Sequence, residues 1–596
     1  MTRRIFSISL LTCFFLSATF AQSNSKPQVT AEELASHVRY LASDDLLGRK
    51  AGSPGAEHAS QYIADQLKAY GLQPAGENGT YFQSFEFISG AELGPNNKLR
   101  VQDAERTLQQ DFVPLAQSSS GSYAGEVVFV GYGISSPKNN FDEYAGVNVT
   151  GKAVLILRGT VDQSNPHSEL AGLTSLDYKI SKAKEMGAAA VFIVSGPIDE
   201  EPDNLTPFRY SRRGMNSGIP VLNITKRMAD VLASSSGKNL RELQVAIQDS
   251  RTPQSVLLQG QPVNVSVEIK EINTKDRNVA ALLEGTDPVL KNEIVVIGAH
   301  FDHLGMGGEG SLSPDMVAIH NGADDNASGT AGLLELAQAF AARKNELKRS
   351  MLFLAFSAEE LGLLGSAHFV KSPTVPLEHI AVMLNMDMIG RLDNNVLIVY
   401  GTGTSPGFEN LVNKHNADSA LTLKLNKDGF GPSDHSSFYG KKIPVFHFFT
   451  GTHPDYHKPT DDTERINAEG MEKVVRLVER MSLDINTSAP RPIYAQVEAP
   501  RPTGQMRGFN VYVGTVPDYS EQTNGMKISS VRDGSPAAKG GIQGGDVMIK
   551  FGKVDVKNVY DYTYALGEYK PGEEIEVVVK RGDETKICKV KLERRN

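Results

Sequence analysis

Residues 294–302 read IVVIGAHFD, a short run of apolar, largely β-branched side chains that ends in His300 and Asp302. Such a run predicts a buried strand, because a strand that is covered on both faces is apolar without alternation. His300 and Asp302 are two positions apart, so an extended chain places them on the same side. This spacing lets a carboxylate accept the second ring N–H of a metal-bound imidazole, which would fix the tautomer and the orientation of the His300 ring.

Residues 293–485 repeat this pattern, with strand-like runs followed by helical runs. The alternation predicts an α/β fold in which a mainly parallel sheet is covered by helices on both faces. In such sheets, ligand sites form beyond the carboxyl ends of the strands. The expected strands are residues 294–300, 350–356, 380–386, 396–400 and 443–450, and the expected helices include residues 330–343, 407–415 and 468–481.

Histidines and carboxylates follow four of the expected strands. They are His300 and Asp302; Asp324 and Asp325 in the next loop; Glu359 and Glu360; Asp387; and His453, Asp455 and His457. Because the strand ends meet at one edge of the sheet, we expect these side chains to share one site. Imidazole and carboxylate donors are typical of borderline divalent metals, with zinc as the leading candidate.

The set is large enough for two ions. Five ligands that share one carboxylate can hold two metals about 3.5–4 Å apart, and the pKa of a metal-bound water can fall from about 15.7 to about 7. A further carboxylate outside the ligand set is needed to take the proton of the water and pass it to the leaving amine. Glu359 and Glu360 suit this division, because the side chains of neighbouring residues point apart.

Five ordered motifs carry a family resemblance. They read AHFDH at residues 299–303, GADDNASG at 322–329, SAEELG at 357–362, NMD at 385–387 and DYHKPTD at 455–461. In order and spacing, these motifs resemble those of the M28 family of zinc aminopeptidases. The resemblance covers residues 31–90 and 263–485, and it implies the zinc exopeptidase fold.

The resemblance also implies a role for each candidate residue. His300 and Asp387 would bind one zinc, Glu360 and His457 would bind the other, and Asp325 would bridge the two. Glu359 would be the general base, and Asp302 would orient a ligand. In this family the water that the ions activate attacks a peptide carbonyl next to the free α-amino group. Cobalt or manganese ions are possible substitutes for zinc.

Some of these residues also have interpretations in which they do not bind a metal. Asp324 and Asp325 could cap the following helix, and Asp324 could do only that. His303 and His453 are expected to support the ligands or to face solvent rather than to bind metal.

Three other motifs do not predict the functions that they suggest at first sight. Ser433-Asp434-His435 is expected to shape a loop near the pocket, since the members of a serine-protease triad normally come from distant segments. Residues 305–310 read GMGGEG, and we expect a flexible loop there rather than a dinucleotide site, because the next helix begins about twenty residues later. No His-Glu-x-x-His motif is present, which excludes a thermolysin-type site.

An inserted domain and a C-terminal domain are expected beside the peptidase domain, which takes residues 22–118 and 262–487. Residues 119–261 form a mixed α/β insert that resembles a protease-associated domain through YAG at 144–146, GKAVL at 151–155 and IPVL at 219–222. Residues 488–504 are rich in proline and predict a stiff linker. Residues 505–596 predict a small β-rich domain, which resembles a PDZ domain through GSPA at 534–537 and GDV at 545–547; the resemblance implies a peptide-carboxylate loop at residues 507–509.

The composition and the N-terminus limit the number of domains, the kinds of partner and the location of the protein. A chain of 596 residues is expected to form two to four domains, and a net charge of −9 without a long basic run excludes a nucleic-acid surface. Residues 1–21 predict a signal peptide, with Arg3 and Arg4 before an apolar run that is too short to span a membrane. We therefore expect a secreted or periplasmic protein, with a lipid anchor at Cys13 as the alternative. Cleavage would leave Cys588 as the single cysteine, so no internal disulfide could form.

The main functional hypothesis is a secreted two-zinc aminopeptidase that acts on peptides. A carboxypeptidase or dipeptidase on the same scaffold is the second hypothesis, and a non-catalytic peptide-binding protein is the third. A glutaminyl cyclase uses a similar fold with one zinc, and the full set of five ligands argues against it. The PDZ-like region is expected either to bind peptide C-termini or to pack against the peptidase domain.

Overall fold

The computed structural model describes most of the chain in a series of ranges. They are residues 28–162, 170, 173–198, 203–208, 210, 217–308, 310–313, 315–417, 421–497, 511–517, 525–532, 534–556, 562, 565–566, 569–582 and 584–594. The predicted signal peptide, Cys13 and the predicted carboxylate loop at residues 507–509 lie outside the described residues. Within the described ranges, no helix has both the length and the apolar character that crossing a membrane requires.

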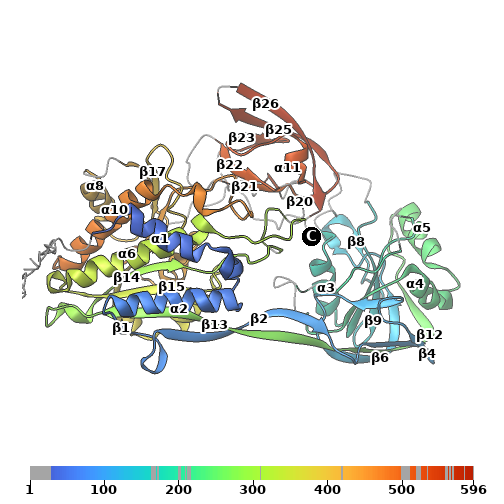
Figure 1. Ribbon diagram of the computed structural model, residues 1–596. Helices are drawn as coiled ribbons and strands as arrows, with labels where there is room; N and C mark the ends of the chain where they lie inside the picture. Colours follow the sequence, from blue (N-terminus) through green and yellow to red (C-terminus); the bar gives the residue numbers. More distant parts are fainter. Residues whose placement is uncertain are drawn as a thin grey trace, which may run out of the picture.

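A nine-stranded sheet forms the centre of the largest region, at the left of Figure 1. Its four central strands run parallel in the order β15-β14-β16-β19. They are β14 (Ile294–His300), β15 (Ser350–Phe356), β16 (Ile380–Met386) and β19 (Val445–Phe449). The predicted parallel sheet is therefore confirmed at the centre, and antiparallel pairs join β13 (Ile269–Leu283) to β15 and β17 (Val396–Tyr400) to β19. Outside them lie β1 (Gln73–Pro74), β2 (Phe82–Leu93) and β18 (Thr422–Leu425).

Helices cover both faces of this sheet, because the strands are apolar on both sides. Every residue of β14, β15 and β16 is buried. In β14, Val295 and Ile297 join one hydrophobic cluster, while Ile294 and Val296 join another on the opposite face. The first cluster includes side chains of α1 (Ala31–Leu41), α2 (Pro54–Ala69), α6 (Gly329–Ala342), α8 (Phe408–Asn416) and α10 (Ala468–Thr487), and the second includes those of α7 (Leu364–Lys371) and α9 (His435–Tyr439).

A second, eight-stranded sheet lies at the end of a long two-stranded ribbon formed by β2 and β13 (Figure 1). Its strands are β3 (Lys98–Val101), β4 (Ala104–Arg106), β5 (Phe112–Pro114), β6 (Gly121–Phe129), β9 (Ala153–Leu157), β10 (Ala190–Val194), β11 (Val221–Ile224) and β12 (Val256–Val267). Helices α3 (Leu176–Glu185), α4 (Lys226–Ala233) and α5 (Leu240–Ser250) accompany it. The sheet begins before residue 119 and ends after residue 261, so it extends past both limits that the sequence suggests for the insert.

A small β-rich region follows residue 511, as the sequence predicts. Its six-stranded sheet contains β21 (Thr515–Pro517), β22 (Met526–Val531), β23 (Val547–Phe551), β24 (Val554–Asp555), β25 (Glu574–Arg581) and β26 (Glu584–Lys591). The short helix α11 (Pro536–Lys539) begins within the GSPA motif. A pair of short strands, β20 (Val511–Tyr512) and β27 (Glu593–Arg594), closes this region.

The described part of the proline-rich segment is tied to the nine-stranded region. Arg491 Nη2 donates to the carbonyl oxygens of Glu378 and Ile380, each at 2.7 Å. Further along, Ala495 N donates to Thr404 O at 2.7 Å, and Val497 N donates to the hydroxyl of Tyr439 at 2.8 Å. Residues up to 497 are therefore docked on this region by hydrogen bonds, and do not act there as a free spacer.

Candidate metal centre

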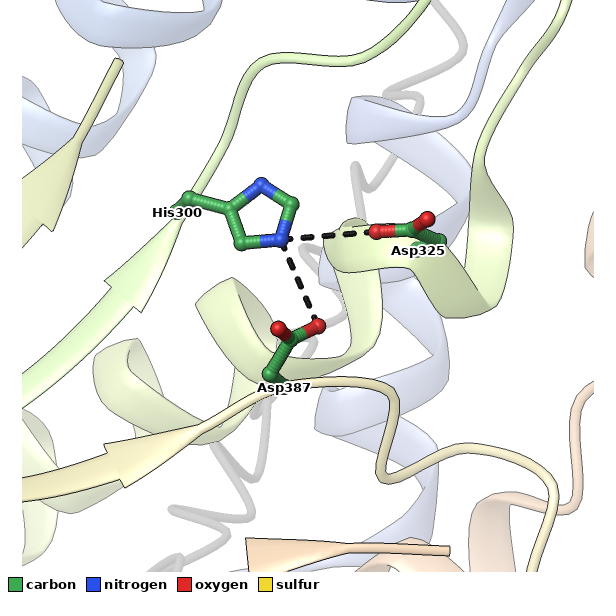
Figure 2. Close-up of side chains that lie close together, drawn as sticks. All are labelled: His300, Asp325 and Asp387. Atoms are coloured by element: carbon green, nitrogen blue, oxygen red, sulfur yellow. Dashed lines mark hydrogen bonds and ion pairs between the residues drawn. The ribbon is translucent and has the colours of Figure 1, made fainter. Parts of the chain in front are cut away.

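The predicted ligands converge where the four parallel strands end. Figure 2 shows His300 at the end of β14, with its ring directed at Asp325 and Asp387. His300 Nε2 lies 3.4 Å from Asp325 Oδ1 and 3.3 Å from Asp387 Oδ1. Since β14 and β16 are parallel neighbours, their carboxyl ends bring His300 and Asp387 to the same edge. These three side chains form one group that could hold an ion.

A second group lies on the other side of Asp325. His457 Nε2 is 3.2 Å from Asp325 Oδ2 and 3.1 Å from Glu360 Oε2. Asp325 therefore directs one carboxylate oxygen toward each histidine. All five predicted ligands lie in one cluster, and Asp325 is at its middle.

The spacing of these atoms fits two zinc ions. Two donors that bind the same tetrahedral zinc at 2.0–2.1 Å lie about 3.3 Å apart. The four nitrogen–oxygen distances in the two groups run from 3.1 to 3.4 Å. The donor set, with imidazole nitrogens and carboxylate oxygens, is also one that zinc uses.

The other ring nitrogen of each histidine faces an acceptor. His300 Nδ1 lies 3.3 Å from the backbone oxygen of Asp302 and 3.7 Å from its carboxylate oxygen Oδ1. His457 Nδ1 lies 2.9 Å from Gly310 O. With the proton on Nδ1, Nε2 of both rings remains available as a metal ligand. Asp302 Oδ1 also accepts a hydrogen bond from Glu359 N at 3.0 Å, so Asp302 contacts both a predicted ligand and the predicted base.

The loop that carries Asp325 is held by buried polar contacts. Asp461 Oδ2 accepts hydrogen bonds from the backbone nitrogens of Asp324 and Asp325, at 3.0 and 3.1 Å. Gly322 has a φ of 55°, and a Cβ atom there would lie 2.1 Å from Asp325 O, so only glycine fits. The chain can therefore turn tightly enough to direct Asp325 into the cluster.

Asp324 does not cap the following helix. The N-cap of α6 is Ser328, whose own side chain does not cap the helix, and the backbone nitrogen of Gly329 donates to Asn326 Oδ1 at 2.9 Å. Asp324 Oδ1 instead accepts a hydrogen bond from Gly390 N at 2.6 Å, and its Oδ2 lies 3.2 Å from His453 Nε2. The capping interpretation is thus wrong for both aspartates, because the π-type turn at Ala323–Ser328 separates them from the helix start.

Arg49 is a fully buried cation next to the loop that carries Asp325, and sequence reasoning did not identify it. Its side chain donates to the carbonyl oxygens of Phe301 at 2.7 Å, Asn321 at 2.6 Å and Gly322 at 2.9 Å, and also to Leu41 O. Burial lowers the pKa of Arg49 to about 10, while Asp302 and Asp325 oppose this shift, so the side chain stays charged at neutral pH. Arg49 thereby links the strand end that carries His300 to the loop that carries Asp325.

Two further groups flank the cluster. Burial raises the pKa of Glu359 well above its usual range, and the carboxylates of Asp387 and Glu360 add to this, while His300 opposes it. The ring of Tyr456 stacks on that of His457, with centroids 3.9 Å apart. Burial, followed by the negative charges of Asp325 and Glu360, keeps the pKa of Tyr456 well above 10, so its phenol is neutral. Sequence reasoning missed Tyr456, although it precedes a predicted ligand directly.

Ser433-Asp434-His435 forms no triad. Both ring nitrogens of His435 are buried without a hydrogen-bond partner among the described residues, and its ring stacks on His447 with centroids 4.3 Å apart. Ser433 Oγ instead accepts a hydrogen bond from Asn385 Nδ2 at 2.8 Å. The hydroxyl therefore has no base among these residues. Ser433 and Asp434 lie in the turn before α9, as the expected loop requires, whereas His435 is the first residue of that helix.

Comparison with known families agrees with this arrangement. Residues 278–482 match the family model of peptidase family M28, and residues 517–592 match that of the PDZ domain. The chain has an M28 peptidase domain. The family resemblance and the enzyme class predicted from the sequence, a metallopeptidase, are thereby confirmed. The predicted PDZ domain is confirmed as well.

Individual relatives of the M28 peptidase domain cover different shares of the chain. Aminopeptidase YwaD from Bacillus subtilis (strain 168) is 27% identical over 378 residues, which is 61% of this chain and 69% of the relative. Leupeptin-inactivating enzyme 1 from Streptomyces exfoliatus is 31% identical over 189 residues, or 32% of this chain and 38% of the relative. Among solved structures, an aminopeptidase from Aneurinibacillus sp. strain AM-1 aligns with a TM-score of 0.45 and 24% identity over 80% of this chain and 98% of that one.

Proposed function

We propose that the chain is a two-zinc aminopeptidase. In this proposal His300 and Asp387 hold one ion, Glu360 and His457 hold the other, and Asp325 bridges them. The observation that carries it is the spacing of 3.1–3.4 Å between each histidine Nε2 and two carboxylate oxygens, with Asp325 common to both groups. The relatives that are named aminopeptidases support the choice of reaction. Cobalt or manganese ions are expected to substitute for zinc.

The substrate would be a peptide with a free α-amino group. When bound, the two ions would polarise the scissile carbonyl and lower the pKa of a water molecule. Three carboxylate ligands against the four positive charges of two zinc ions would leave one excess positive charge on the ligand set itself, and the buried Arg49 adds a fixed cation near Asp302 and Asp325. The site is therefore suited to stabilise negative charge that develops on the peptide carbonyl oxygen.

Glu359 is proposed as the general base. It lies beside the cluster, with Oε2 at 4.0 Å from His300 Nε2, and it is not one of the five side chains spaced as ligands. Its carboxylate would take a proton from the attacking water and deliver it to the leaving amine. Asp302 would keep the His300 ring in place and, through the backbone nitrogen of Glu359, would fix the position of the base.

Tyr456 is proposed to stabilise the transition state. Its phenol remains protonated, so the hydroxyl can donate a hydrogen bond but is not expected to accept a proton. The ring stacks on His457, and the charges of Asp325 and Glu360 act on the hydroxyl, which indicates that it lies near the ion-binding groups. A donor fixed there can stabilise the carbonyl oxygen as it gains charge.

The other regions have proposed roles as well. We propose that the insert is a protease-associated domain. The chain would then consist of a discontinuous peptidase domain, this insert and a PDZ domain. The sheet of the insert runs from Lys98 to Val267. The PDZ domain is proposed to bind peptide C-termini. Secretion or export to the periplasm remains a proposal that rests on residues 1–21 alone.

Metal analysis combined with a peptide-library digest tests the function. Purified protein should contain two zinc equivalents, and mass spectrometry should show removal of N-terminal residues from free peptides but not from N-acetylated peptides. Removal of C-terminal residues from both kinds of peptide would show a carboxypeptidase. Two bound ions without hydrolysis of any peptide would favour a binding protein.

A further inference from the structure

His303 is a buried histidine next to the second group of ligands. It lies three positions after His300, and its backbone nitrogen donates to Arg49 O at 3.2 Å. The side chain is fully buried. His303 Nδ1 lies 2.6 Å from Glu360 Oε1, while its other nitrogen, Nε2, has no hydrogen-bond partner among the described residues. The ring is therefore directed at one atom of a proposed ligand.

The two oxygens of Glu360 have different neighbours. Oε2 lies 3.1 Å from His457 Nε2, which is close to the separation of two donors on one tetrahedral zinc. Oε1 lies 2.6 Å from His303 Nδ1, which is too short for that arrangement and lies at the short limit of a hydrogen bond to an ionised carboxylate. Because an ionised carboxylate only accepts, the proton of this bond belongs to His303 Nδ1.

Their distances to Asp325 distinguish His303 from His457. His303, Asp325 and Glu360 also form a group that could hold an ion, so both His303 and His457 are candidate ligands of the second ion. However, His303 Nδ1 is 3.9 Å from Asp325 Oδ2, whereas His457 Nε2 is 3.2 Å from the same oxygen. The two rings stand edge to face, at 73° and 5.7 Å between centroids, on either side of Glu360.

We propose that His303 is a positioning residue for Glu360. The hydrogen bond from His303 Nδ1 occupies Oε1, so that only Oε2 of Glu360 is available to bind the ion held with His457. The inference rests on the proposed two-ion site. It adds a residue that increases the affinity for the ion held by Glu360 and His457. Partners that orient a metal ligand in this way typically contribute 10- to 100-fold to metal affinity.

Three substitutions separate positioning from ligation. His303→Asn places an amide N–H close to the position of Nδ1, His303→Gln places it close to that of Nε2, and His303→Ala removes the donor. His37→Asn is a matched control, since His37 is also buried but bonds to the hydroxyl of Tyr62 in α2 and pairs with Glu335, neither of which is a proposed ligand. The first ion, held with His300, reports in each variant whether the site is folded.

The measurement is zinc retained by the full chain after dialysis against buffers of graded free zinc concentration, together with the visible spectrum of the cobalt-substituted protein. We expect His303→Asn and the control to keep the second ion like the wild type. His303→Gln and His303→Ala should lose it at a 10- to 100-fold higher free zinc concentration, with the first ion retained.

The contradicting outcomes are distinct. If His303→Ala binds the second ion as tightly as the wild type, His303 has no positioning role. If His303→Asn loses the ion as readily as His303→Ala, then His303 is itself a ligand and the inference is overturned. A wild-type protein that binds fewer than two ions would instead contradict the proposed function on which the inference rests.

Discussion

The two halves of the proposed metal centre are held in different ways. His300 and Asp387 stand at the ends of the adjacent parallel strands β14 and β16, and the His300 side chain is 1% exposed. His457 lies in a loop well beyond the end of β19 at Phe449, and its side chain is 14% exposed. The sheet itself therefore fixes the half with the fully buried histidine, here called the buried half, whereas contacts between loops must fix the half with the partly exposed histidine, here called the open half. A hydrogen bond from His457 Nδ1 to Gly310 O and one from His303 Nδ1 to Glu360 Oε1 supply that support.

The largest expected effect concerns Glu359, which belongs to neither half. Glu359→Gln should keep both ions but lower kcat by about 10²- to 10⁴-fold, because the amide cannot accept the proton of the water. Steady-state kinetics on amino-acid anilides and metal analysis provide the measurement. Glu284→Gln, at an exposed glutamate paired with Lys291, is the matched control and should behave like the wild type. Unchanged turnover in Glu359→Gln would remove this residue from the mechanism.

Alanine substitutions of the two histidines compare the halves directly. His457→Ala should lose one ion and change the free energy of unfolding of the metal-free protein little. His300→Ala should lose one ion and also lower that free energy by roughly 2–5 kcal/mol, because it leaves a cavity at a fully buried position. Urea unfolding and metal analysis together distinguish these results. Retention of two ions by His457→Ala would contradict the ligand assignment, and equal destabilisation would contradict the difference between the halves.

Arg49 should affect both halves at once, since its guanidinium bonds to Phe301 O and Gly322 O. Arg49→Met leaves buried carbonyl groups without donors, and we expect a loss of at least about 3 kcal/mol in the free energy of unfolding, with weaker binding of both ions. Arg49→Lys should recover only part of this, because an ammonium group lacks the forked donor geometry.

Arg349 provides the control for Arg49. It is equally buried and donates to Ile485 O at 2.8 Å, but it precedes β15 at the end of the sheet that is remote from the ligands. Arg349→Met should lower the free energy of unfolding without changing the affinity for either ion. If both variants weaken metal binding to the same extent, Arg49 has no specific role at the site.

Much of the site could be predicted because it follows from strand ends. His300, Asp387 and the Glu359–Glu360 pair each follow an apolar run, and parallel strands bring such positions together. Arg49 and the role of Asp324 could not be predicted, since their partners are backbone groups of loops distant in sequence. Proline content indicates a stiff segment after residue 488, but does not reveal that Arg491 ties it to Ile380.

The limits of the insert were difficult to predict for a similar reason. The strand β4 (Ala104–Arg106) is short and largely exposed, and β3 (Lys98–Val101) carries two basic side chains. Neither is an apolar run, so neither is apparent as a strand of the second sheet. Their pairing with each other and with β12 places them there, and this pairing depends on contacts that are remote in sequence.

The smallest expected effect is that of Tyr456, which lies over the open half. Tyr456→Phe keeps the stacking on His457 but removes the hydroxyl donor. We expect kcat to fall about 10- to 100-fold with little change in metal content, which is somewhat less than the loss of a principal oxyanion donor. Tyr62→Phe, at a tyrosine that bonds to His37, serves as the control. A loss of the second ion in Tyr456→Phe would show that the ring supports His457 rather than the reaction.

Anomalous diffraction at the zinc edge from crystals of the zinc-loaded protein tests the two-ion centre most directly. The account predicts two peaks about 3.5–4 Å apart, one 2.0–2.2 Å from the named atoms of His300, Asp325 and Asp387, and the other equally close to those of Asp325, Glu360 and His457. A single peak, or a second peak that is bound by His303 in place of His457, would contradict it.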